Sequence, residues 1–115
     1  MSAPVPRTDV SRPSPAAFHY GPAHVIVHGN PAFLELFGAG SVGVPAREAM
    51  AELPAAAFEL MDRVYREGRP LARQILLPSG ARRLVVVPRR DPEDGDTYGV
   101  ATHLRPYLPP LAPEA

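Results

Sequence analysis

Apolar residues follow helical spacing in two stretches of this chain and strand spacing in several others. In residues 27–37, VHGNPAFLELF, the apolar residues after the NP dipeptide fall on one face of a helix. Asn30 can cap that helix, Pro31 suits its first position, and Gly38 is placed to end it in a left-handed conformation. This pattern predicts a helix over residues 31–37 that directly follows a strand.

The longest helical pattern covers residues 55–67. One face carries its apolar residues, Ala57, Phe58, Leu60, Met61, Val64 and Tyr65. The opposite face carries two acid-before-base pairs, Glu59–Arg63 and Asp62–Arg66, each expected to add about 0.2–0.5 kcal/mol. Gly68 is expected to end the helix. We therefore predict a helix that packs its apolar face on a sheet.

Alternating or β-branched apolar residues mark the strands. Strand patterns cover residues 17–20, 24–28, 71–77, 82–89 and 96–104, and a short helical turn fits residues 46–51. Short connections rich in turn residues join the last three strands, which predicts an antiparallel meander. The order of strands and helices predicts an α+β fold, with one sheet and the helices on one of its faces.

Prolines are frequent at both ends of the 115-residue chain. Residues 1–16 lack any apolar period and predict a disordered arm, and residues 106–115 predict a Pro-rich tail. Residues 17–105 then form one folded domain of about 90 residues.

Charge and cysteine content exclude several classes of function. The 12 basic and 12 acidic residues leave no net charge that would attract nucleic acid or an anionic membrane. The absence of cysteine excludes disulfides, thiolate catalysis and Cys-ligated metals. There is no signal-peptide pattern, and the aliphatic run at 84–87 is too short to span a bilayer. We therefore expect a cytoplasmic protein.

Several short motifs occur in a fixed order: NPAF at 30–33, LFG at 36–38, GVP at 43–45, DRVY at 62–65, EGRP at 67–70 and VVP at 86–88. Together they resemble a PAS domain over residues 18–105. The DRVY and EGRP motifs are similar to those of PAS modules in actinobacterial signalling kinases and phosphatases. The resemblance implies a five-stranded antiparallel sheet with helices on one face, and a role in sensing or in partner contacts.

The resemblance also implies where a ligand and a partner would bind. A pocket between the sheet and the helices would be lined by Ile26, His28, Phe33, Phe37, Phe58, Met61, Tyr65, Leu84, Val86 and Ala101. Simple core packing is the alternative role of these side chains. The other sheet face would carry Val85, Val87 and Val100, which are candidates for an interface with a second protomer or a partner.

Most cofactors of such domains lack their usual residues here. Photoactive flavin and cinnamic chromophores in the family need a cysteine, and residues 55–67 contain no histidine to ligate haem. His24 and His28, on one face of a strand with Ile26, would lie about 13 Å apart, too far to share a metal ion. We expect no cofactor and no metal; haem held at His28, or an unidentified small molecule, is the alternative.

Nothing in the sequence indicates catalysis. Ser41 and Ser79 lie in Gly-containing turns, and the acidic residues of loop 91–96 fit a solvated turn better than a calcium site. We therefore predict a non-catalytic PAS sensory or interaction module that signals through protein–protein contacts in trans, as a homodimer or with a signalling partner. The alternative is a PAS sensor that binds haem or a small ligand.

Overall fold

The computed structural model of the protein describes residues 13–107. Its elements are β1 (Ala16–Tyr20), β2 (Val25–Gly29), α2 (Pro31–Phe37), a 3-10 turn η1 (Ala39–Ser41), α3 (Ala46–Ala49), α4 (Ala55–Glu67), β3 (Leu71–Leu77), β4 (Gly80–Arg90) and β5 (Thr97–Pro106). The helices α2 and α4 have the bounds predicted from the sequence. The predicted arm and tail lie largely outside the described residues. None of the helices in this part of the chain combines the length and apolar character that crossing a membrane requires.

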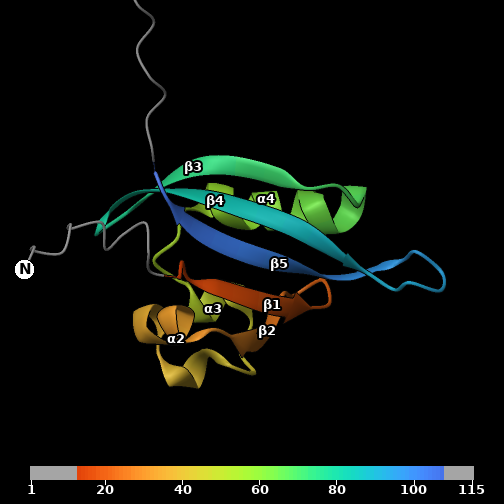
Figure 1. Cartoon of the computed structure of the whole chain (residues 1–115), viewed down its shortest axis with the longest axis horizontal. Coiled ribbons are helices and arrows are strands. Elements are labelled where there is room, and N and C mark those ends of the chain that lie inside the picture. Colours follow the sequence, from red (N-terminus) through yellow and green to blue (C-terminus); the bar gives the residue numbers. More distant parts are fainter. Residues whose placement is uncertain (1–12, 108–115) are drawn as a thin grey trace, which may run out of the picture.

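The strands form one five-stranded sheet in the order β2-β1-β5-β4-β3. Every neighbouring pair is antiparallel. Helix α4 lies behind β3 and β4, while α2 and α3 lie beside β1 and β2 (Figure 1). The predicted α+β architecture is therefore confirmed, and β1 and β5 join the first and last parts of the chain at the centre of the sheet.

Asn30 fixes the corner between β2 and α2. Its Oδ1 accepts the backbone N–H of Phe33 at 2.9 Å, which confirms the predicted helix cap. The same oxygen accepts from the N–H of Ala16 at 3.0 Å, and Nδ2 donates to the carbonyl of Ser14 at 2.9 Å. This one side chain therefore starts α2 and holds the beginning of β1.

Two glycines end the main helices in different ways. Gly68 after α4 is left-handed, with φ 74° and ψ 26°, as predicted. Gly38 after α2 has φ 95° but an extended ψ of 148°, so the predicted left-handed helical conformation is wrong there. Its N–H still bonds the carbonyl of Leu34, at 2.7 Å.

Helix α4 buries the predicted apolar face against the sheet: Ala57, Phe58, Leu60, Met61 and Val64 are buried, and Tyr65 is half-buried. The two predicted ion pairs are wrong. Arg63 pairs forward with Glu67 at 3.3 Å, while Asp62 pairs with His24 and Arg47. Asp62 therefore faces neighbouring elements across the helix edge, instead of a partner along the helix.

The register of β5 reverses one prediction about its two faces. Leu84 and Val86 of β4 point toward α4 and pair with Leu104 and Thr102. Since directly opposed residues share a face, every second residue from 104 back to 100 points inward. Val100 is accordingly fully buried in the core, which excludes it from the outer interface. Ala101 pairs with Val87 and faces outward, away from the predicted pocket.

A bulge in β2 overturns the prediction about which face His28 occupies. Ile26 pairs with His19 and His28 pairs with Phe18, so Val27 is an extra residue without a partner in β1. Ile26 points into the core, whereas His28 is exposed, with its ring 5.9 Å from the ring of Phe18. The predictions that His28 shares the face of Ile26 and lines a pocket are therefore wrong.

Candidate functional site

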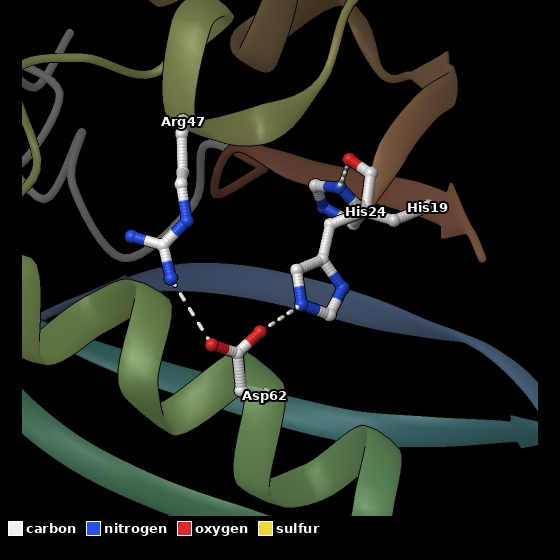
Figure 2. A network of polar contacts seen from close by, with 4 residues as sticks. All are labelled: His19, His24, Arg47 and Asp62. Carbon is white, nitrogen blue, oxygen red and sulfur yellow. Dashed lines mark hydrogen bonds and ion pairs between the residues drawn. The ribbon is translucent and has the colours of Figure 1, made fainter. Parts of the chain in front are cut away.

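A polar network lies on the inner side of the sheet and joins elements that are distant in the sequence. His19 of β1 contacts both Thr102 of β5 and the backbone of His24. The side chain of His24 then reaches Asp62 of α4, which also binds Arg47 of α3 (Figure 2). The network therefore links the sheet to α3 and α4.

His19 is fully buried and has a partner at each ring nitrogen. Its Nδ1 lies 3.1 Å from the carbonyl oxygen of His24 and its Nε2 2.9 Å from the hydroxyl of Thr102. A carbonyl can only accept, so Nδ1 carries the proton and Thr102 donates to Nε2. Burial lowers the pKa of His19 to about 4, opposed by the bond to His24 and aided by the charges of His24 and Arg89. His19 is therefore neutral near pH 7.

His24 closes the turn between β1 and β2 in a left-handed conformation, with φ 57°. Its N–H bonds the carbonyl of Gly21 at 3.0 Å, and its own carbonyl accepts the N–H of Ala46 at 3.1 Å. A non-glycine residue in this region is uncommon, although histidine is among the more tolerant. The backbone at His24 thus ties the turn to the beginning of α3 at some conformational cost.

The imidazole of His24 is 2% exposed. Nε2 lies 2.7 Å from Oδ1 of Asp62, and Oδ2 of Asp62 lies 3.0 Å from a guanidinium nitrogen of Arg47. The ring packs edge-on to Tyr65, at 6.0 Å between centroids. Nδ1 of His24 is buried without a hydrogen-bond partner among the described residues. An orphan buried nitrogen and a strained backbone at one residue are typical of a functional position.

The arrangement resembles a base held by a carboxylate, because Asp62 favours a proton on Nε2 and leaves Nδ1 as the variable atom. Nδ1 can accept a hydrogen bond when the ring is neutral or donate one when it is protonated. No hydroxyl or amine of the described residues lies within bonding distance of it, so the network offers no nucleophile at this nitrogen. No cluster of three metal-ligating side chains occurs in residues 13–107.

Most of the predicted pocket residues gather around this network or in the adjoining core. Ile26, Phe33, Phe58, Met61, Leu84 and Val86 are buried, while Phe37 and Tyr65 pack at the core margin. None of the ten candidates lines either of two open grooves, of about 510 and 600 Å³, that lie around α2 and Pro13. A ligand at the eight positions other than His28 and Ala101 thus stays a prediction.

A second candidate surface lies on the opposite face of the sheet. The guanidinium of Arg89 lies 4.5 Å from the ring centre of Phe18 and 4.9 Å from that of Tyr98, and it donates to the carbonyl of His19 at 3.1 Å. Tyr20 packs on Tyr98 at 6.2 Å between rings. Phe18 and Tyr20 remain 45% and 58% exposed. We call Phe18, Tyr20, Val87, Arg89 and Tyr98 the outer-face cluster.

Sequence reasoning selected Val87 of this cluster but missed its aromatic and arginine members. The signal was present in the alternation of β1, AAFHY, which sends Phe18 and Tyr20 to one face and His19 to the other. The inner network was also missed. His24 was assigned to a strand, and Asp62 to an exposed ion pair.

No family model matches this sequence, and no curated protein does. Solved structures do. The PAS domain of histidine kinase ThkA aligns with a TM-score of 0.67 at 14% identity, over 82% of this chain and 99% of that one. A sensory box histidine kinase from Vibrio cholerae aligns with a TM-score of 0.67 at 20% identity, over 80% of each chain.

VqmA bound to DPO aligns with a TM-score of 0.64 at 21% identity, over 85% of this chain and 53% of VqmA. The chain thus spans about half the length of VqmA. The three alignments cover 80–85% of this chain. The chain therefore has the fold of a PAS domain, as its sequence motifs indicated.

Proposed function

We propose that this chain is a non-catalytic sensory signalling module that transmits its signal by contact with another protein through the outer face of its sheet. The observation that carries this proposal is the outer-face cluster. Tyrosine, phenylalanine and arginine are the side chains over-represented at the centres of protein interfaces. Here they lie together, partly exposed, on the sheet face opposite α4.

The surrounding positions support the same role. Val85 and Val87 are half-buried on this face and flank Ala101 and His103 of β5. An apolar sheet face with an aromatic centre gains free energy when a partner removes it from water. Arg89 is already held by two rings and by a backbone carbonyl, so little further conformational freedom would be lost on binding.

Substitution of Val87→Glu tests the proposal. We expect self-association of the purified protein, measured by light scattering behind size exclusion over a dilution series, to weaken about tenfold or more, because the partner would have to bury a carboxylate. The matched control is Val42→Glu. Val42 is 46% exposed in the loop after η1, outside the outer-face cluster. A wild-type monomer at every concentration, with a melting temperature unchanged by Val87→Glu, would contradict the proposal.

A second candidate function is the sensing of a small molecule at His24. It is favoured by the buried Nδ1, which a hydrogen-bonding group of a ligand could satisfy. VqmA, of similar fold, is bound to DPO. Native mass spectrometry of freshly purified protein tests this. We expect a stoichiometric small molecule to be retained by the wild type and lost in His24→Asn, which still tolerates the left-handed backbone. Retention unchanged by the substitution would exclude this site.

We propose that no haem, metal or other cofactor is resident. The exposed position of His28 speaks against a haem ligand there, and an absorption spectrum without a Soret band is the expected result. A VqmA–ligand–DNA complex is also similar in fold, but this chain covers 45% of that one. Since basic and acidic residues balance, we propose a protein as the partner in place of nucleic acid or membrane, and the cytoplasm as the compartment.

A further inference from the structure

The outer face carries uncompensated positive charge at one end. Arg83 of β4 lies directly opposite Arg105 of β5 on the face that also holds Val85 and Val87. Both arginines are exposed, and neither has a carboxylate within 4 Å among the described residues. Like charges directly opposite each other destabilise a sheet. This pair therefore provides a place for an anionic partner.

The other end of the same hairpin carries the opposite charge. The β4–β5 loop holds four acidic residues, Asp91, Glu93, Asp94 and Asp96. Two of their carboxylates accept backbone N–H groups of the loop itself, at 2.8 and 2.9 Å. None of the four forms an ion pair within residues 13–107. In Figure 1 this loop lies at the right-hand end of the sheet and the β3–β4 turn lies at the left.

The two ends are too far apart to neutralise each other within one molecule. Eight residues of extended strand separate Arg83 from Asp91, which is about 26 Å. That is about three times the screening length at physiological ionic strength, roughly 8 Å. The outer-face cluster and Val85 lie between them. Along one direction the basic pair is thus followed by an apolar and aromatic centre, whose one cation, Arg89, is stacked on two rings, and then by the acidic loop, in a chain of zero net charge.

We infer that the partner of this face is a second copy of the chain, packed with its strands antiparallel to those of the first. A two-fold axis in the plane between the sheets can run along the strands or across them. An axis along the strands would place the arginines on arginines and the acidic loop on its copy. An axis across them places Arg83 and Arg105 of each protomer on the acidic loop of the other, twice. This inference rests on the proposed function.

Cross-linking between engineered cysteines tests the orientation, because the native chain has no cysteine. Gln74 lies opposite Arg83 at the basic end of this face, and Pro92 lies in the acidic loop; both are exposed. Gln74→Cys and Pro92→Cys leave every charge in place. We expect a short bismaleimide to link an equimolar mixture of the two variants, with each variant alone linking several-fold less. Glu59→Cys, on the exposed side of α4, mixed with Gln74→Cys is the background control.

Each outcome of the cross-linking experiment either supports or overturns the antiparallel arrangement. Mixed linkage above the Glu59→Cys background supports the antiparallel pair. Preferential linkage of Gln74→Cys to itself overturns the orientation and leaves the proposed function standing. A wild-type dimer in which neither position links above background places the interface elsewhere and overturns both. A wild type that is monomeric at every concentration overturns the inference, and a melting temperature that is also unchanged by Val87→Glu overturns the proposed function with it.

Charge reversal gives an independent measurement. We expect the double substitution Arg83→Glu and Arg105→Glu to weaken self-association about tenfold or more, and added salt to weaken the wild type similarly. A second variant, Asp91→Arg with Asp94→Arg, should self-associate poorly but pair with the first. Self-association that is unchanged or stronger in either reversed variant would contradict the antiparallel arrangement, because an arrangement with like ends together is already repulsive in the wild type.

Discussion

The two faces of strand β1, which lies between β2 and β5, carry polar groups in opposite environments. On the inner face His19 is fully buried, and each of its ring nitrogens has a defined partner. On the outer face Phe18 and Tyr20 stay about half exposed, and Arg89 stacks on Phe18 while contacting the carbonyl of His19. Within one short strand, His19 thus belongs to the buried hydrogen-bond network, while its neighbours Phe18 and Tyr20 belong to the partly exposed outer-face cluster.

This difference predicts what each face responds to. Burial lowers the pKa of His19 on the inner face, so acid acts on this face through that residue. The outer face holds its charge in water, so salt acts on this face, and under the proposed function a protein partner does too. Under the proposed function, a signal received on one face would be transmitted from the other, because β1 and β5 contribute to both.

The largest expected effect concerns packing on the two faces. Phe58→Ala on α4 should reduce the free energy of unfolding by about 3–5 kcal/mol, because Phe58 is 5% exposed and its removal leaves a cavity. Phe18→Ala should cost about 1–2 kcal/mol, since that ring is 45% exposed. Urea denaturation of both variants measures this. Equal losses would show that the outer face is as tightly packed as the core and would contradict the difference between the two faces.

The next effect is the pH dependence of stability. Because the pKa of His19 falls from 6.5 to about 4 on folding, the unfolded chain binds more protons between these values. Stability is therefore fully present above pH 6.5 and is lost as pH falls toward 4, by about 3 kcal/mol from this residue.

Denaturation at several pH values checks this. His19→Asn should flatten the dependence between pH 6.5 and 4, whereas His28→Asn, at an exposed position, should leave the wild-type slope. The comparison of slopes separates proton linkage from the general cost of the substitution. A His19→Asn slope identical to that of the wild type would show that the buried imidazole is not the group that titrates.

The fold could be predicted from the sequence where local signals agreed. Asn30 and Pro31 set the beginning of α2, Gly68 set the end of α4, and turn residues separated β3, β4 and β5. These signals act within a few residues of the chain, so one sequence contains all the information they need. The resemblance to PAS motifs then implied one five-stranded antiparallel sheet with the helices on one face, which local signals alone cannot give.

The candidate site could not be predicted in the same way, because it depends on register and on contacts across the fold. The bulge at Val27 exposes His28, and the pairing of Val86 with Thr102 buries Val100. His24 and Asp62 are 38 residues apart, and helical periodicity gave Asp62 an equally plausible partner at Arg66. Spacing rules predict partners within one helix or strand, and they contain no information about a partner in a different element.

The smallest expected effect tests whether Asp62 joins the inner network energetically. Asp62→Asn can still accept a hydrogen bond from Nε2 of His24, but it loses the charge shared with His24 and Arg47. We expect a loss of about 1 kcal/mol in the free energy of unfolding, with the side chain of Asp62 40% exposed. Glu67→Gln is the matched control: it removes exposed pairs with Arg63 and Arg69 and should cause no resolvable loss.

A double-mutant cycle with His24→Asn completes this test. If the His24–Asp62 contact is a working link between the β1–β2 turn and α4, the two substitutions together should cost less than the sum of their separate effects. Strictly additive losses in the free energy of unfolding would show that Asp62 is not coupled to His24 and stabilises the fold through Arg47 alone. The inner face would then be an ordinary core with two buried histidines, and the signal-receiving role would have to move to the outer face.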